Sequence, residues 1–121
     1  MSSSKQQLES TICGVGSSIA ENVAQKNDIE KALGVLCNDG VYAYYVFVKS
    51  LKTRKNKSQD YNPFLKNIEI LMQFTHTELN GDNYQDYFRN LSRDINDLLF
   101  FKEILEQALT YARYHAKASD H

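Results

Sequence analysis

Turn-forming residues are scarce in this chain, which has five glycines and one proline among 121 residues. A sandwich or barrel of this length needs turn residues about every 8 to 12 positions. Six such residues are too few, so an all-β fold is disfavoured. The length fits a single hydrophobic core. We therefore expect residues 1–121 to form one all-α domain, a compact bundle of five or six helices, with disordered ends at residues 1–4 and 119–121.

Apolar residues recur at helical spacing along most of the chain. The pair Asn62-Pro63 is a start signal, because asparagine caps a helix and proline loses nothing at the first helical position. The pair Asn80-Gly81 is a stop signal. The spacing and these signals predict helices over residues 5–26, 41–53 and 63–79. They also predict a helix capped by Asn27 or Asp28 that ends at 38–40, a short helix that begins at Asp82 or Asn83, and a last helix that begins at Ser92 or Asp94 and runs to 118.

The stretch from Val41 to Val48 (VYAYYVFV) is compatible with two structures. Its β-branched and aromatic residues, and the Asp-Gly pair before it, fit a strand entered from a hairpin turn. No second strand of matching length flanks it, and an isolated strand leaves its backbone groups unpaired. We favour a buried helix over 41–53, followed by a polar loop over 53–60. Its expected core residues are Val41, Tyr44, Tyr45, Val48 and Leu51.

Hydropathy and cysteine content indicate a cytoplasmic protein with no membrane partner. Mean hydropathy is −0.51, and the eight-residue apolar run at 41–48 is far shorter than the roughly 20 residues that span a bilayer. The first residues lack the features of a secretory signal. Cys13 and Cys37 form no CxxC pair, so we expect two free, partly buried thiols in a reducing compartment.

Residues for catalysis or metal binding are sparse. His76 belongs to no HExxH motif, and no two histidines stand four residues apart; we expect it at the surface or the edge of the core. Asp94 and Asp97 lie three apart, a spacing that is routine on solvated helices. We predict that the chain is not an enzyme and has no cofactor and no metal site.

The formal net charge of −1 conceals a basic run at residues 49–57. The run holds five cations and no acid, which leaves nine cations against 15 acids elsewhere. It is either the solvated end of a helix or a contact to RNA phosphates, which needs only a few basic side chains. Tyr42 and Tyr61 flank it and could stack on a base. The candidate RNA-binding residues are Lys49, Lys52, Arg54, Lys55 and Lys57.

The helix predicted over 94–118 carries an apolar arc of roughly 220° at 100° per residue, whereas a surface helix needs only about 100°. One explanation is a central helix that contacts three neighbours. The other is a surface buried by another protein, where aromatic residues are enriched. The candidate interface residues are Phe100, Ile104, Tyr111 and Tyr114.

Two blocks resemble the small α-helical subunit of type III CRISPR effector complexes, of the Cmr type. They are Lys31–Lys49 (KALGVLCNDGVYAYYVFVK) and Glu103–Ala118 (EILEQALTYARYHAKA). The first resembles that family's helix, glycine break and following helix, and the second resembles its last helix. The matched positions of the first block are Leu36, Gly40, Val41, Phe47, Val48, Lys49 and Ser50. The family's proline is replaced by Leu33 or Gly34, its alanine by Val46, and its frequent tryptophan is absent.

The resemblance implies a non-catalytic subunit acting in antiviral defence. Such a subunit stacks with copies of itself along the duplex of guide RNA and target RNA, and holds target RNA through basic side chains. Its protein partners are the repeated backbone subunits and the large polymerase-like subunit. Of the five candidate RNA-binding residues, only Lys49 belongs to the matched motif. The other four cations of the run are candidates because of their charge alone. The alternative is a helical adaptor or homodimer with no role in nucleic-acid binding.

Overall fold

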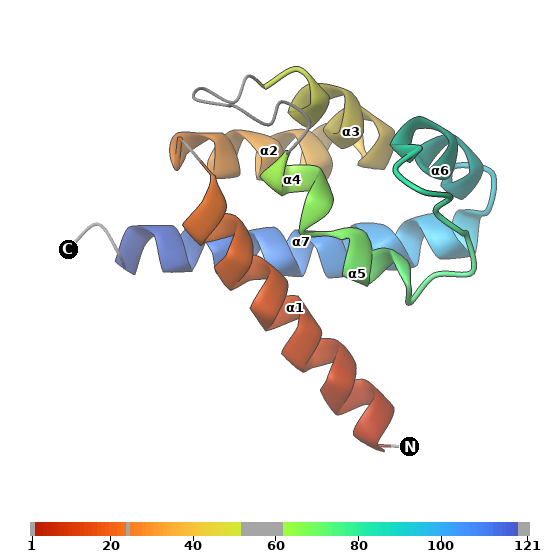
Figure 1. Cartoon of the computed structure of the whole chain (residues 1–121), viewed down its shortest axis with the longest axis horizontal. Coiled ribbons are helices and arrows are strands. Elements are labelled where there is room, and N and C mark those ends of the chain that lie inside the picture. The colour runs from red at the N-terminus through yellow and green to blue at the C-terminus, as the bar shows by residue number, and fades with distance from the viewer. Residues whose placement is uncertain (1, 24, 52–61, 119–121) are drawn as a thin grey trace.

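Seven helical segments and no strand make up the part of the chain that the computed structural model describes, residues 2–23, 25–51 and 62–118 (Figure 1). They are α1 (Ser2–Asn22), α2 (Asn27–Asp39), α3 (Val41–Lys49), α4 (Pro63–Lys66), α5 (Glu69–Met72), α6 (Tyr84–Leu91) and α7 (Ile95–Ala118). The short segments α4 and α5 form one interrupted helix, so the count by helices is six. The predicted all-α class with five or six helices is confirmed.

The helix α7 lies at the centre of the fold. It contacts α1, α2, α5 and α6 (Figure 1). Eight of its residues are buried. Its wide apolar arc therefore serves several neighbours at once. This supports the first of the two explanations of that arc over most of its width.

A close crossing joins α1 to α7. A Cβ atom added at Gly16 would lie 2.8 Å from the carbonyl oxygen of Ala108 and 2.8 Å from the Cβ of Tyr111. Two backbones approach this closely only where a side chain is missing. Gly16 is thus required by packing, whereas a Cβ at Gly14 would meet nothing within 4 Å. The helix begins at Ser2, so it includes residues 2–4, which we expected in a disordered end, and it ends four residues before the predicted boundary.

A single residue connects α2 to α3. Gly40 has φ of +98°, a conformation that favours glycine, and its N–H donates to the carbonyl of Leu36. The stretch after it is a helix, as favoured over a strand, with Val41, Tyr44, Tyr45 and Val48 buried. It ends at Lys49 and leaves Leu51 only half-buried. Residues 53–60, predicted as a loop, and the expected disordered end at 119–121 lie outside the described residues.

The predicted continuous helix over 63–79 was wrong. Its start is confirmed, because the Asn62 side chain accepts from the N–H of Phe64. The helix breaks at Ile68, which has ψ of 1°, after the Asn67 side chain has bonded the carbonyl of Pro63. It then ends at Met72. The Thr75 hydroxyl donates to the carbonyl of Met72, which in a continuing helix would accept from the N–H of residue 76.

Capping residues start the two remaining helices as predicted. The Asn83 side chain accepts from the N–H of Asp86 at the start of α6. The Asp94 side chain accepts from the N–H groups of Asn96 and Asp97 at the start of α7. Both are ordinary N-caps, whose loss costs about 1 kcal/mol each.

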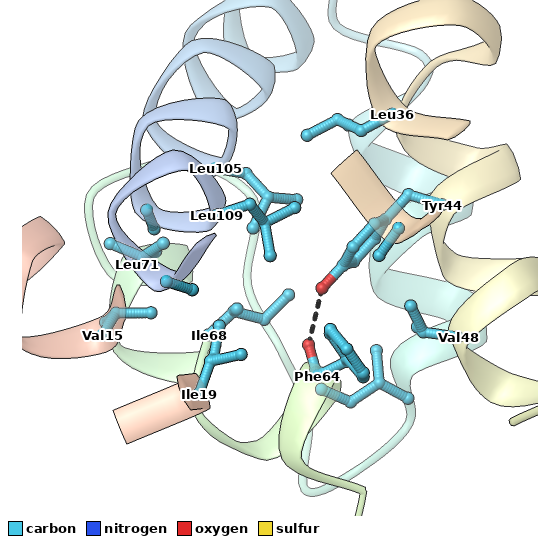
Figure 2. Close-up of a cluster of buried hydrophobic side chains, with 14 of the residues drawn as sticks. Val15, Ile19, Leu36, Tyr44, Val48, Phe64, Ile68, Leu71, Leu105 and Leu109 are labelled. Carbon is cyan, nitrogen blue, oxygen red and sulfur yellow. Dashed lines mark hydrogen bonds between the residues drawn. The ribbon is translucent and has the colours of Figure 1, made fainter. Parts of the chain in front are cut away.

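All the helices contribute buried side chains to one core, and Figure 2 shows the part of it between α7, α1, α2, α3 and the interrupted helix. Its one polar link in that view joins the Tyr44 hydroxyl of α3 to the carbonyl of Phe64 at 2.9 Å. Burial raises the pKa of Tyr44 far above its ordinary value, so this hydroxyl stays a neutral donor. The other labelled apolar side chains of this cluster are Val15, Ile19, Leu36, Val48, Ile68, Leu71, Leu105 and Leu109.

Candidate functional site

Lys49 is the last residue of α3 and the first cation of the basic run. Its ammonium lies 5.5 Å from the centre of the Tyr45 ring, a cation–π distance that fixes the side chain at the end of α3. The N–H of Leu51 and the side-chain amide of Asn62 both donate to the carbonyl of Val48, at 3.2 and 2.9 Å. Leu51 and Asn62, which lie before and after the other four cations in the sequence, are therefore both hydrogen-bonded to the carbonyl of Val48, the residue before Lys49.

The other predicted RNA contacts, Lys52, Arg54, Lys55 and Lys57, lie outside the described residues, as does Tyr61. Tyr42 is exposed on α3, and its ring contacts that of Tyr45, with the ring centres 5.8 Å apart. Within the described residues, the predicted RNA-binding surface consists of Lys49 with Tyr42 nearby along the same helix.

The predicted protein interface on α7 is divided by burial. Tyr111 and Tyr114 are 40% and 58% exposed, and Phe100 is half-buried against the core. Ile104 is 3% exposed because it packs inside the core. The structure therefore removes Ile104 from this surface and leaves the two tyrosines as its accessible members.

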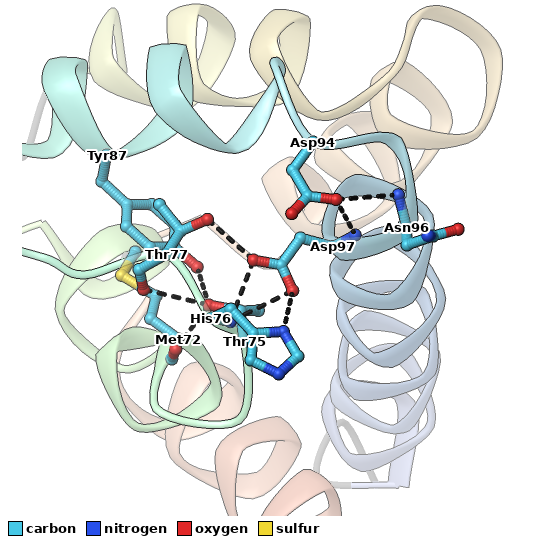
Figure 3. Close-up of polar contacts among 8 residues, drawn as sticks. All are labelled: Met72, Thr75, His76, Thr77, Tyr87, Asp94, Asn96 and Asp97. Carbon is cyan, nitrogen blue, oxygen red and sulfur yellow. Dashed lines mark hydrogen bonds and ion pairs between the residues drawn. The ribbon is translucent and has the colours of Figure 1, made fainter.

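A buried carboxylate at the start of α7 was missed by the sequence analysis, which treated Asp94 and Asp97 as a solvated pair. That interpretation was wrong for Asp97, which is 4% exposed. Figure 3 shows its contacts with the loop after α5. Asp97 accepts from the N–H of His76 at 2.9 Å, from the Thr77 hydroxyl at 2.8 Å, and its other oxygen lies 3.3 Å from Nδ1 of His76. Asp94, by contrast, is exposed and caps the helix.

The Asp97 carboxylate is stabilised as an anion. Burial opposes the charge, but the hydrogen bonds from the His76 N–H and the Thr77 hydroxyl outweigh it, so the pKa of Asp97 is lowered. Burial raises the pKa of the neighbouring Tyr87 to about 12, and its hydroxyl shares a 2.9 Å bond with Thr75. These groups satisfy one another and tie the loop after α5 to α6 and α7, which is a structural role. His76 itself is exposed at this edge, as expected.

A second missed cluster gathers charge near the end of α7. Nη1 of Arg113 lies 3.8 Å from a carboxylate oxygen of Glu30 on α2, and its guanidinium carbon lies 5.7 Å from the centre of the Tyr114 ring. The buried Nε of Arg113 has no hydrogen-bond partner within the described part of the chain. Arg113 and Glu30 line a surface pocket together with Lys26 and Lys117. The sequence signal was weak, because the cluster joins two helices that lie far apart along the chain.

Both cysteines are free, as predicted, but they are exposed, so the expectation of partial burial was wrong. Desolvation and the nearby carboxylate of Glu106 raise the pKa of the Cys37 thiol. Glu106 in turn is bonded at 2.7 Å to Lys102 one turn earlier. A thiol with a raised pKa is a poor nucleophile at neutral pH.

Within residues 2–23, 25–51 and 62–118, no three His, Cys, Asp or Glu side chains are placed to bind a metal ion together. In the same ranges no helix combines the length and the apolar content that crossing a bilayer requires. Comparison with protein-family models finds no matching family, and comparisons with curated proteins and with solved structures find no match either.

Proposed function

We propose that this chain is a non-catalytic small subunit of a type III CRISPR effector complex. It contacts phosphates of the target RNA, paired with guide RNA, through the basic run at 49–57. It contacts copies of itself, the repeated backbone subunits and the large polymerase-like subunit through protein surfaces that include Tyr111 and Tyr114. The proposed location is the cytoplasm.

The observation that most supports this proposal is the anchoring beside Lys49. Leu51 and Asn62 are bonded to the same carbonyl, that of Val48. In the sequence, the other four cations of the basic run lie between these two residues. Five positive charges within nine consecutive residues, on a chain of net charge −1, form a local site for a polyanion.

The residues that carry the family resemblance also support it. The block 31–49 coincides with α2, Gly40 and α3. Gly40, matched to the family's glycine, has the positive φ that only glycine adopts readily. A glycine is therefore required here by the backbone, which gives the matched position a physical reason.

The RNA contact is tested by two variants that each reverse four charges. One changes Lys52, Arg54, Lys55 and Lys57 to Glu; the matched control changes Lys31, Lys66, Arg89 and Arg93, which are exposed elsewhere. Binding of a short single-stranded RNA is measured as salt is raised. The first variant should lose at least about tenfold in affinity, and its salt slope should fall by about 0.7 for each phosphate that the variant no longer neutralises.

The control variant should keep most of the affinity, since it changes net charge by the same amount at other places. An equal loss in both variants would show that RNA responds only to net charge, and the proposal would fail. A salt response that is flat in the unmodified chain would contradict it as well. The single change Lys49→Glu separates the one position carried over by the resemblance from the rest of the run.

A helical adaptor or homodimer without a role in RNA binding is the second candidate function. The exposed rings of Tyr111 and Tyr114 favour it, because large aromatic side chains at the surface are typical of protein interfaces. Sedimentation of the isolated chain distinguishes the two: this candidate requires association between copies, or with a protein partner, that persists at high salt and needs no RNA.

A further inference from the structure

A pocket of about 300 Å³ lies where the start of α2 meets the end of α7. Since one water occupies about 30 Å³ of liquid, the pocket has room for a small anionic group with its hydration. We call it the α2–α7 pocket. It carries three cations and one carboxylate, a net charge of +2. Its lining residues are Lys26, Asn27, Glu30, Arg113, Ala116 and Lys117.

Arg113 is the best-positioned donor in this pocket. Glu30 holds one end of its guanidinium and the Tyr114 ring lies beside it, so the side chain is fixed on two sides. Its Nε is buried and finds no partner in the described residues. That atom is not accessible to a ligand, but the side chain as a whole is 35% exposed, so a ligand reaches Arg113 through the rest of its guanidinium.

Lys26 is also held in place. Its ammonium donates to the carbonyl of Ala20 at 2.6 Å, near the end of α1. An ammonium has three hydrogens, so two are left for a ligand. Lys117 adds a third cation from the last turn of α7. Two of the three cations are thus fixed before any ligand arrives, which lowers the entropy cost of binding.

We propose that the α2–α7 pocket binds a phosphate monoester group, with the terminal N–H groups of Arg113 and the ammonium groups of Lys26 and Lys117 as donors. A phosphate monoester carries about −1.5 to −2 charges at neutral pH, which matches the pocket's net charge of +2. Arginine is well suited to it, because its planar fork bonds two phosphate oxygens at once. Glu30 orients the guanidinium and offsets part of the positive charge.

None of the described residues that line the pocket belongs to the basic run. A phosphodiester in an RNA backbone carries one charge, whereas the pocket's charge fits a terminal phosphate. That group is found on a free nucleotide and on a 5′-phosphorylated RNA end. The proposal does not depend on the proposed RNA contacts at residues 49–57, and reversing those charges should leave phosphate binding in the pocket unchanged.

The first test follows the Nε–Hε resonances of the arginines in the ¹⁵N-labelled full chain during titration with inorganic phosphate. The Arg113 resonance should shift and saturate, while those of Arg89 and Arg93 should not. Sodium chloride at matched ionic strength is the reference. A shift in Arg113 that fails to saturate, or that chloride reproduces, would overturn the proposal without any need for a variant.

Substitutions then assign the donors. Arg113→Lys keeps the charge and removes the planar guanidinium, and it should weaken phosphate binding at least about tenfold, as expected for the loss of one charge-assisted bond. Lys26→Gln should weaken it by a smaller factor. Lys31→Gln, on the same helix as Glu30 but outside the pocket, is the matched control and should leave the affinity unchanged. Equal weakening by Lys31→Gln would reduce the effect to net charge and refute the site.

The source of the phosphate is distinguished by two further probes. If an RNA terminus is bound, 5′-phosphorylated RNA should bind more tightly than the same RNA with a 5′-hydroxyl, and Arg113→Lys should abolish the difference. If a free nucleotide is bound, a nucleoside monophosphate should saturate the Arg113 shift and the two RNAs should bind alike. Failure of all phosphate-bearing probes would refute the pocket proposal while leaving the RNA contact at 49–57 to stand or fall by its own test.

Discussion

At its N-terminal end, α7 presents a buried carboxylate whose oxygens are bonded to the loop after α5. Near its C-terminal end, it presents a buried guanidinium nitrogen with no partner in the described chain and two exposed tyrosine rings. At the first end, which we call the closed end, the Asp97 carboxylate is hydrogen-bonded within the fold. At the second, which we call the open end, Nε of Arg113 has no partner in the described residues and the rings of Tyr111 and Tyr114 are exposed. Saturated polar groups stabilise a structure, and unsatisfied ones mark the places where another molecule adds most.

Loss of the Asp97 carboxylate is expected to break the closed end. Asp97→Ala leaves the His76 N–H and the Thr77 hydroxyl without their acceptor, and should lower the free energy of unfolding by about 3 kcal/mol. Urea denaturation followed by circular dichroism measures this. Thr77→Val, which removes one donor and keeps the shape, should cost about 1 kcal/mol. Equal stability of Asp97→Ala and the unmodified chain would refute the structural role.

The crossing of α1 and α7 lies on the way to the open end, and a methyl group should disturb it. Gly16→Ala places a Cβ 2.8 Å from the backbone oxygen of Ala108, and should lower stability by about 2 kcal/mol through overpacking. Gly14→Ala is the matched control on the same helix. It meets no atom within 4 Å, and should raise stability by up to about 1 kcal/mol because alanine favours the helix. The same sign for both substitutions would contradict the close crossing.

Acid should weaken the closed end more gently. Because the pKa of Asp97 is lowered in the fold, its stabilisation is fully present above its ordinary value of 3.8 and is lost as pH falls through the lowered value. The effect should be smaller than that of either substitution, since a protonated carboxyl still accepts hydrogen bonds. Asp97→Asn should flatten the loss of stability below about pH 4, measured by thermal unfolding at stepped pH. An unchanged acid response in Asp97→Asn would show that other carboxyl groups carry it.

The open end should tolerate loss of its aromatic rings. The double change Tyr111→Ala and Tyr114→Ala keeps the Cβ that borders Gly16, and should alter stability by no more than about 0.5 kcal/mol, as is usual for surface positions. Assembly with partner subunits or with copies of the chain, followed by sedimentation, should weaken clearly. A large loss of stability would instead place these rings in the core, and unchanged assembly would remove them from the interface.

Local signals in the sequence were sufficient for much of the fold. The starts of three helices follow from the capping residues Asn62, Asn83 and Asp94, each of which acts within three positions of itself. The single-residue break at Gly40 likewise follows from a local need for positive φ. Helix spacing then predicted four of the five core residues over 41–53.

Distant contacts explain what was missed. The helix predicted through residue 79 ends at Met72 because the His76 N–H bonds Asp97, 21 positions away, in place of a carbonyl four positions back. Spacing alone cannot reveal such a partner. Burial of Ile104 beside exposed Tyr111 has the same origin, since both lie in the apolar arc of α7 and only the neighbouring helices decide between them.

The crossing at Gly16 also bears on how the chain acquires its structure during synthesis. Gly16 and Ala108 are more than ninety positions apart, so the central packing joins two of the most widely separated parts of the described chain. Ribosomes add about 5–20 residues per second, which leaves the apolar stripe of α1 without its main partner for several seconds. A chain stalled before α7 would expose that stripe, and it would depend on chaperones until α7 is made.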